Sequence, residues 1–220
     1  MFIGHIGVGL ALKKAEWECN VAWFVAGALF LDLVLWLLVL LRMETVYIPQ
    51  NFTQIHYLTF NFPYSHSLVA SLLWSALFFL IGTPLFGKRA GFLFAAAVFS
   101  HFICDLIEHV PDLAIYDDMS PKLGLSLWKH MPIAIGLEIV IAVVGLRFYL
   151  QSTRPGNRRF AKHGMTFFVI FVSLLQIVSM YAPGLPDAAA LASNSFVSLT
   201  IIIVLVYLLD KRRVHASLQA

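Results

Sequence analysis

Residues 90–109 read AGFLFAAAVFSHFICDLIEH, a run of twenty residues that contains no Lys or Arg. A helix of about 20 apolar residues crosses the ~30 Å hydrocarbon core of a bilayer. The whole chain of 220 residues is 60% hydrophobic and only 12% charged, about half the charged share of a soluble domain. A soluble fold of this size could not bury so much apolar surface, so the sequence predicts a membrane protein.

On either side of this run, the sequence contains five further long apolar segments and one short one. The long segments cover residues 20–41, 67–86, 132–151, 164–182 and 193–210, and residues 2–14 are too short to span. Because unpaired backbone groups cannot be satisfied in lipid, all of these segments should be helices. Gly and Pro residues separate them, and no internal repeat is visible. We therefore predict an all-α polytopic bundle of six long helices plus a short N-terminal helix. Residues 1–151 should hold the polar site, and residues 152–220 should form a C-terminal helix pair and tail with no polar cluster.

The basic residues indicate the orientation of the bundle, because short cytoplasmic loops are enriched in Lys and Arg. Eleven basic residues fall on one side and three on the other. The larger set is Lys13, Lys14, Lys88, Arg89, Arg154, Arg158, Arg159, Lys162, Lys211, Arg212 and Arg213, and the smaller set is Arg42, Lys122 and Lys129. We expect a multi-pass protein of the bacterial inner (cytoplasmic) membrane with a cytoplasmic C-terminus. Residues 42–66, 110–131 and 183–192 should then face outward.

Composition excludes several classes of function. The formal net charge of +3 is spread over loop clusters and forms no basic stripe with aromatic residues, so we expect no nucleic-acid partner. Cys19 and Cys104, the two cysteines, provide neither a disulfide framework nor a CxxC metal pair. Residues 1–14 lack the layout of a cleavable signal, since Lys13 and Lys14 follow the apolar stretch.

Ionisable residues inside the apolar segments are costly and call for a partner. Asp32 lies in the middle of segment 20–41, so it should be protonated and bridge two helices, be paired, or bind a cation. His101, Asp105 and His109 are spaced by four residues, which places all three on one face of a helix. Two ligands at i and i+4 are the device that zinc proteases use. These residues are candidate metal ligands, although His109 is equally suited to a place at the membrane interface.

Two further histidines lie near helix starts. His66 stands between Ser65 and Ser67, either of which suits the N-cap of the next segment. A neutral imidazole in a first helical turn can bind a metal, and the alternative is a plain capping turn at the membrane surface. His5 lies among glycines that permit close helix packing, where a lone His is more often structural than a ligand. At ~1.5 Å per residue, Asp32 and His101 each lie ~18 Å above the inner ends of their segments and His66 lies ~33 Å above Lys88. These heights are compatible with one site in the outer half of the bilayer if tilt lowers His66.

Taken in order, these motifs resemble those of the YdjM-like family of membrane-bound, metal-dependent hydrolases. The likeness covers about residues 1–140 and rests on the start of the chain up to His5, the Asp32 segment, Tyr64-Ser65-His66-Ser67, His101-x-x-x-Asp105 and His109-Val-Pro-Asp112-Leu. The later run of residues 121–128 is also similar to this group.

That family is in turn similar to zinc-dependent phospholipases C and related single-strand nucleases. The resemblance implies that Asp32, His66, His101 and Asp105 are the primary metal ligands. It also implies that His5 completes a second site that shares Asp105. The chain departs from those enzymes in two respects: it lacks a second His-x-x-x-His-x-x-x-Glu set, and Met1 stands where they have a ligand residue.

The chemistry that fits these residues is metal-assisted hydrolysis. A His/Asp site with an open position suits zinc or manganese, and paired metals suit phosphoester cleavage. We expect a divalent metal, most simply zinc, as cofactor, with membrane lipids and a lipid or phosphoester substrate as partners. Candidates for an acid, a base or a supporting role are Glu108, Asp112 and Glu138, and candidates for contact with a head group are Trp128 and Lys129.

Two alternatives remain beside the hydrolase. An ion-coupled transporter would use Asp32, His101 and Asp105 as a cation or proton path, but the sequence has no inverted repeat and no pair of interrupted helices. A non-catalytic membrane scaffold would have a closed metal site or none.

Overall fold

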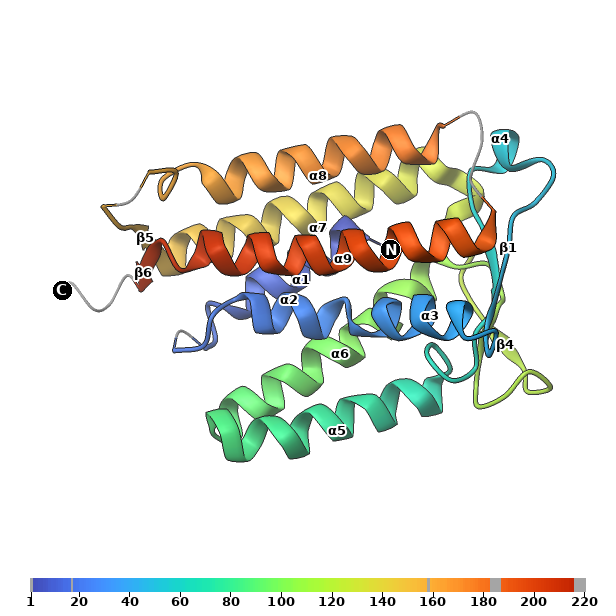
Figure 1. The fold of residues 1–220 in the computed structure, drawn as a ribbon, viewed down its shortest axis with the longest axis horizontal. Coiled ribbons are helices and arrows are strands. Elements are labelled where there is room, and N and C mark those ends of the chain that lie inside the picture. The colour runs from blue at the N-terminus through green and yellow to red at the C-terminus, as the bar shows by residue number, and fades with distance from the viewer. Residues whose placement is uncertain (1, 17, 158, 183–186, 216–220) are drawn as a thin grey trace.

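The helices form a bundle whose loops gather at two ends (Figure 1). The computed structural model describes residues 2–16, 18–157, 159–182 and 187–215. Within these ranges, four helices are long and apolar enough to cross a membrane. They are α5 (Leu68–Phe86), α6 (Lys88–Glu108), α7 (Met131–Ser152), which continues the 3-10 turn η1 (Leu127–His130), and α9 (Ala188–Asp210). The predicted all-α class is confirmed, and these apolar helices are those of a membrane protein.

The prediction of six long helices is met only in part. α8 (Gly164–Met180) has 17 residues, about 26 Å of helix, which is shorter than the ~30 Å hydrocarbon core. Residues 20–41 do not form one helix, because α2 (Ala22–Ala28) and α3 (Phe30–Leu40) meet at an angle of 54° and make at most one bent span. The short N-terminal helix is present as α1 (Ile3–Leu12).

The outward-facing side chains of the long helices are apolar. Leu73 and Leu80 of α5 and Phe167 and Phe171 of α8 are 60–67% exposed. Water-soluble proteins rarely leave large contiguous apolar surfaces uncovered. In a bilayer these side chains contact lipid, so the bundle is apolar both inside and outside.

The bend between α2 and α3 has a consequence for two polar residues. At Leu29, φ is −100° and ψ is 2°, which interrupts the helix. The interruption puts Asp32 in the first turn of α3, where the partial positive charge of a helix N-terminus favours a carboxylate. The Ala28 carbonyl oxygen at the bend accepts a hydrogen bond from His101 Nδ1 at 2.7 Å. A straight helix over residues 20–41 would use this carbonyl for its own backbone ladder.

α1 lies inside the bundle, where it packs against α2, α6 and α7. A Cβ added to Gly7 would lie 2.7 Å from Ala142 Cα, and one added to Gly145 would overlap the Gly7 carbonyl oxygen. Glycine at positions 7 and 145 therefore lets α1 and α7 touch backbone to backbone, in line with the packing role expected for the N-terminal glycines.

Replacing Gly145 with alanine is expected to destabilise the protein by about 1–3 kcal/mol, because the new Cβ would push α1 away from α7. Gly136 of the same helix is the matched control, since nothing lies within 4 Å of a Cβ added there. Thermal unfolding in detergent, followed by tryptophan fluorescence, compares the two variants. Equal stability of Gly145→Ala and Gly136→Ala would contradict the close contact.

The start of α1 is held by two polar side chains. Phe2 N and Gly4 N donate to Glu138 Oε2 at 2.6 and 3.2 Å. Ile3 N donates to Gln176 Oε1 at 3.0 Å. The first N–H groups of a helix have no partner within the helix, so Glu138 and Gln176 satisfy donors that would otherwise be buried and unpaired.

Short antiparallel strand pairs connect the loops at both ends of the bundle (Figure 1). At one end, β1 (Thr45–Tyr47) pairs with β2 (Thr59–Asn61), and β3 (Leu113–Ala114) pairs with β4 (Lys122–Leu123). The short helix α4 (Phe52–Ile55) lies at the same end. At the other end, β5 (Thr153–Pro155) pairs with β6 (Arg213–His215). The second end also holds the loop after α1 and the turn between α5 and α6. The larger set of basic residues therefore gathers at one end, except for Arg158, which lies outside the described residues.

A buried ion pair ties this second end together. Lys13 Nζ lies 3.3 Å from Asp210 Oδ2, and both residues are only 6% exposed. The Tyr149 hydroxyl donates to Asp210 Oδ1 at 2.9 Å, and Val21 N donates to Asp210 Oδ2 at 2.9 Å. One carboxylate thus joins α7 and α9 to the segment between α1 and α2.

Candidate metal centre

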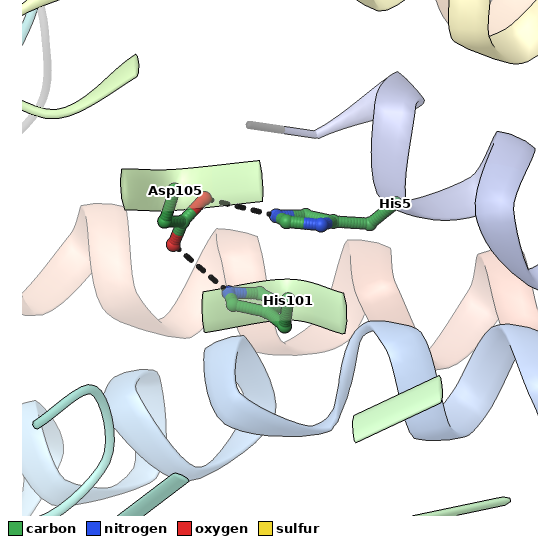
Figure 2. Close-up of side chains that lie close together, drawn as sticks. All are labelled: His5, His101 and Asp105. Carbon is green, nitrogen blue, oxygen red and sulfur yellow. Dashed lines mark hydrogen bonds and ion pairs between the residues drawn. The ribbon is translucent and has the colours of Figure 1, made fainter. Parts of the chain in front are cut away.

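The middle of the candidate site lies on α6. His101 and Asp105 are four residues apart on this helix, with His101 Nε2 at 3.1 Å from Asp105 Oδ2. His5 reaches the same carboxylate from α1, with Nε2 at 3.1 Å from Asp105 Oδ1 (Figure 2). The His5 and His101 rings stack with centroids 3.7 Å apart and planes 10° apart. All three side chains are buried.

Asp32 and His66 join this group from two other elements. Asp32 comes from the first turn of α3. His66 lies just before α5, whose N-cap Ser67 accepts a hydrogen bond from Ala70 N at 3.1 Å. His66 Nε2 lies 3.1 Å from His101 Nε2 and 3.6 Å from Asp32 Oδ1. The capping turn proposed for this segment is present, and it holds a histidine beside the site.

The donor atoms stand at the spacing of metal ligands. His66 Nε2 is also 3.6 Å from Asp105 Oδ2, and His101 Nε2 is 3.7 Å from Asp32 Oδ1. Five pairs among the four donors therefore measure 3.1–3.7 Å. Ligands about 2.0–2.2 Å from a tetrahedral metal lie ~3.3 Å from one another. The donor atoms of Asp32, His66 and His101 fit one divalent metal, and Asp105 lies within 3.1–3.6 Å of both imidazoles.

The tautomer of His66 follows from its hydrogen bonds. The Ser65 hydroxyl donates its single hydrogen to Glu44 Oε2 at 2.7 Å, so its contact with His66 Nδ1 at 2.7 Å has the imidazole N–H as donor. Glu44 Oε1 also accepts from Tyr64 N and Ser65 N, both at 2.8 Å. Burial raises the pKa of the Glu44 carboxyl, and these hydrogen bonds oppose the rise. His66 therefore carries its proton on Nδ1 and turns an unprotonated Nε2 toward the site.

His101 and His109 are held in the same way. His101 Nδ1 donates to the Ala28 carbonyl oxygen at 2.7 Å, and His109 Nδ1 donates to Asp112 Oδ1 at 2.9 Å. A second hydrogen bond of this kind is what fixes the tautomer and orientation of metal-binding histidines. Asp112 thus orients His109, and the three rings aim Nε2 at the cluster.

This arrangement is unfavourable without a cation. The Nε2 atoms of His66 and His101 face each other at 3.1 Å, and two neutral rings that each carry their proton on Nδ1 cannot form a hydrogen bond there. Asp32 and Asp105 add carboxylate charge beside them, and Asp105 is only 1% exposed. Buried charge is retained in proteins mainly where it is paired or binds a metal. The chemistry of the donor set therefore fits a divalent metal.

A second group of donors overlaps the first. His5, His101 and Asp105 form one group, and Asp32, His66 and His101 form the other. His109 Nε2 lies 3.6 Å from Asp105 Oδ2. Among the described residues, His5 Nδ1 is a buried nitrogen without a hydrogen-bond partner. Asp105 thus has imidazole nitrogens close to both of its oxygens, as a carboxylate shared by two metals would.

A cavity of about 380 Å³ reaches the cluster. Asp32, His66, Asp105 and His109 line one part of it. Much of the remaining wall is apolar and comes from α3, the 52–62 loop and α9: Leu35, Trp36, Phe52, Phe60, Leu191 and Leu199. Ligand sites in proteins commonly combine an apolar cavity with a few polar groups. A molecule in this cavity would touch four of the six candidate ligands.

The buried glutamates hold structure around the site. Glu138 lines the cavity, but its two oxygens accept from Phe2 N, Gly4 N and Gln176 Nε2, the last at 2.6 Å. Glu108 is buried and accepts from Trp128 Nε1 at 3.1 Å. Glu108 and Asp112 do not line the cavity, within the part of the chain that the structure describes.

The two head-group candidates lie in different places. Trp128 lines the cavity, and its ring centroid is 3.9 Å from that of His109. Lys129 is exposed and lines a separate pocket with His56 and His130. Trp128 is thus part of the wall beside the cluster, while Lys129 is not.

Several polar residues at the site were not predicted from the sequence. Glu44 is one of them, and it fixes His66 through Ser65, which was expected only as a possible N-cap. The last two helices, for which no polar cluster was expected, contribute Gln176 and Ser179 from α8 and Asn194, Ser195 and Ser198 from α9 to the cavity wall. The available signal was an amide side chain, Gln176 or Asn194, inside an apolar segment. Met1, discussed above as a departure, lies outside the described residues.

No family model, curated protein or solved structure matches this chain. The class of protein therefore follows from its own structure: a helical membrane protein with a buried His/Asp cluster at the end of a cavity.

Proposed function

We propose that this protein is an integral membrane, metal-dependent hydrolase of a phosphoester, with a phospholipid as the natural class of substrate. The observation that carries the proposal is the set of four donor atoms at 3.1–3.7 Å beside an apolar cavity. A site with an exposed edge toward a cavity suits catalysis better than a closed structural site, which uses every coordination position for protein ligands.

In this proposal His66, His101, Asp32 and Asp105 hold the first metal, and His5 with Asp105 holds a second. Zinc suits this mixture of imidazole and carboxylate, and manganese is the alternative. A divalent metal supplies a Lewis acid that polarises a phosphoryl oxygen and makes water a stronger nucleophile. His109 stands beside the cavity, where it can bind either the metal or the substrate.

The remaining candidates act by positioning. Asp112 holds the His109 ring, and Glu44 acts through Ser65 on His66. Glu138 holds α1, and with it His5, because its oxygens accept from the first turn of that helix. Glu108 holds Trp128 in the cavity wall. Partners of this kind typically change metal affinity or activity 10–100-fold, roughly, when they are removed.

We also propose that the protein lies in the inner membrane of a bacterium with its C-terminus in the cytoplasm. The gathering of basic residues at one end of the bundle supports this orientation. In this topology α8 crosses as a sixth span, and a shorter helix is accommodated by local thinning of the bilayer. The metal centre then lies nearer the outer face.

The first test is the metal content of the detergent-purified protein. Wild type supplied with zinc is expected to retain one or two equivalents after gel filtration, and His101→Ala is expected to retain far less, because His101 belongs to both donor groups. His163→Ala, an exposed histidine at the start of α8, is the matched control and should bind like wild type. Equal metal content in all three proteins would remove the ligand assignment.

A phosphoester screen then separates hydrolysis from the alternatives. Zinc-loaded wild type should convert a water-soluble phosphodiester or a phospholipid into an alcohol and a phosphomonoester, and His101→Ala should not. Metal binding without hydrolysis, combined with zinc or proton flux in proteoliposomes, would favour the ion-coupled transporter. Metal binding with neither would favour the scaffold.

A further inference from the structure

The entrance to the cavity can be located from the exposure of its wall. Among the described residues that line the cavity, three are exposed: Ser179, Asn194 and Ser198. Ser179 belongs to α8 and the other two belong to α9. The wall contributed by α3, α6, α7 and the 52–62 loop is buried or half-buried. The cavity therefore opens sideways, between α8 and α9, rather than through the loops at the end of the bundle.

α8 and α9 touch at the end of the bundle where α8 begins and α9 finishes. A Cβ added to Gly164, the first residue of α8, would lie 2.8 Å from Leu209 Cδ2 near the end of α9. Farther along, Gln176, Ser179 and Met180 of α8 and Asn194, Ser195 and Ser198 of α9 line the cavity. In Figure 1 the axes of α8 and α9 run along the length of the bundle, with α7 visible between them. The opening thus lies toward the end at which α8 finishes and α9 begins.

The opening is at the depth of the lipid hydrocarbon. From the start of α9 at Ala188, Asn194 lies ~9 Å and Ser198 ~15 Å along the helix, at 1.5 Å per residue. A 23-residue helix such as α9 is about 34 Å long and covers the ~30 Å core. Ser198 therefore lies near the middle of the bilayer, where the molecules available to enter are lipids.

The lining of the cavity suits a phospholipid whose phosphate lies at the His/Asp cluster. No Lys or Arg is among its described lining residues, so a phosphate inside it can be neutralised by the metal centre but by no side-chain cation of that kind. Leu191, Leu199, Leu35 and Trp36 offer an apolar surface for acyl chains. Amide and hydroxyl groups at the opening can bind the glycerol and ester oxygens of a lipid, which are uncharged.

We propose that the substrate is a membrane phospholipid that enters sideways between α8 and α9, with its phosphoester at the His/Asp cluster and its acyl chains left in the opening. This inference rests on the proposed hydrolase function for the fate of the phosphoester. The entry route itself is a binding property that does not depend on hydrolysis.

The experiment is photo-cross-linking in vesicles of phosphatidylethanolamine and phosphatidylglycerol. A trace phospholipid with a diazirine in its acyl chain is activated by light, and the labelled peptides are identified by mass spectrometry. Zinc-loaded wild type should be labelled in residues 176–180 and 191–199. The double variant Asn194→Trp with Ser198→Trp should lose labelling there by roughly tenfold, about 1.4 kcal/mol, because the two indole rings would fill the opening.

Thr200→Trp is the matched control, since Thr200 is exposed on α9 but does not line the cavity. It should be labelled like wild type. A second variant, Ser179→Trp, blocks the opening from α8 and covers the case in which the double variant does not fold. Zinc content equal to that of wild type shows that a variant has kept its fold. Labelling unchanged by both blocking variants, or reduced equally by Thr200→Trp, would overturn the entry route.

Hydrolysis gives an independent comparison. The blocking variants should lose activity on phospholipid vesicles, whereas Thr200→Trp should keep it. Cleavage of bis-(p-nitrophenyl) phosphate, a water-soluble diester, tests hydrolysis by the wild type itself. If wild type cleaves neither substrate, the hydrolase proposal fails while the labelling still decides the entry route. If wild type cleaves both and the blocking variants cleave vesicle lipid at the wild-type rate, the hydrolase stands and the entry route is wrong.

Discussion

Replacing Asp105 with asparagine is expected to lower the zinc affinity of the purified protein by at least about 100-fold, since even outer partners of metal ligands are worth 10–100-fold. Asp105 is the residue that the most candidate ligands share. Its oxygens lie 3.1 Å from His5 Nε2 and His101 Nε2 and 3.6 Å from His66 Nε2 and His109 Nε2. Asparagine keeps the shape but removes the negative charge that a divalent cation requires. A competition titration against a chromophoric zinc chelator gives the affinity.

Glu108→Gln is the control for this substitution. Glu108 is a buried acid on the same helix, one turn further on, and it belongs to neither donor group. Its zinc affinity should stay within about tenfold of wild type, at the low end of the range for outer partners. Circular dichroism checks that both variants remain helical. A folded Asp105→Asn protein that binds zinc like wild type would rule out Asp105 as a ligand.

Replacing Asp210 with alanine is expected to reduce the free energy of unfolding by about 3–5 kcal/mol, because it removes the carboxylate that balances the charge of the buried Lys13 ammonium. The same change removes the acceptor for the Tyr149 hydroxyl and for Val21 N. Three elements that meet at this end would lose their common contact. Thermal unfolding in detergent measures the loss, and metal content should be retained at temperatures where the variant is folded.

An exposed ion pair provides the comparison. Lys122 Nζ and Asp118 Oδ1 are 3.8 Å apart, with 29% and 48% of the two side chains exposed. Asp118→Ala should change the stability by only ~0–1 kcal/mol, as is usual for surface pairs. If Asp210→Ala and Asp118→Ala lowered the free energy of unfolding equally, the contacts of Asp210 would not stabilise this end of the bundle in the way that its burial indicates.

The membrane class and the helical positions of His101 and Asp105 could be predicted because they depend on local patterns. Apolar length identifies a span, and a spacing of four residues places two side chains on one helical face. The proximity of Asp32 and His66 to His101 and Asp105 does not depend on a local pattern, so it could not be predicted in this way. A sequence gives the height of a residue along its own helix but not the rotation or neighbours of that helix.

Two further features could not be predicted from the sequence, and each has a physical reason. The 54° bend at Leu29 occurs in an apolar run without Pro, and Gly27, two residues earlier, is an isolated glycine of the kind that a helix tolerates, so it does not mark the break by itself. The cavity wall on α8 and α9 is made from isolated Ser, Asn and Gln residues. Single hydroxyls in membrane helices commonly bond to a carbonyl of the preceding turn, as Ser193 and Thr200 do here at 2.9 Å. No local sequence pattern distinguishes hydroxyl groups that bond to the backbone of their own helix from hydroxyl groups that face a cavity.

The burial of α1 sets an order of events during synthesis. Its partners come much later in the chain: His5 meets Asp105, the N–H groups of its first turn meet Glu138, and Ile3 N meets Gln176. At a translation rate of about 5–20 residues per second, the 173 positions that separate Ile3 from Gln176 take roughly 10–35 s to make. During this time α1 lacks its hydrogen bond to Gln176, which has not yet been synthesised. The His/Asp cluster is consequently fixed late in assembly, because Glu138 and Gln176, which hold the start of α1, are made after all of its candidate ligands.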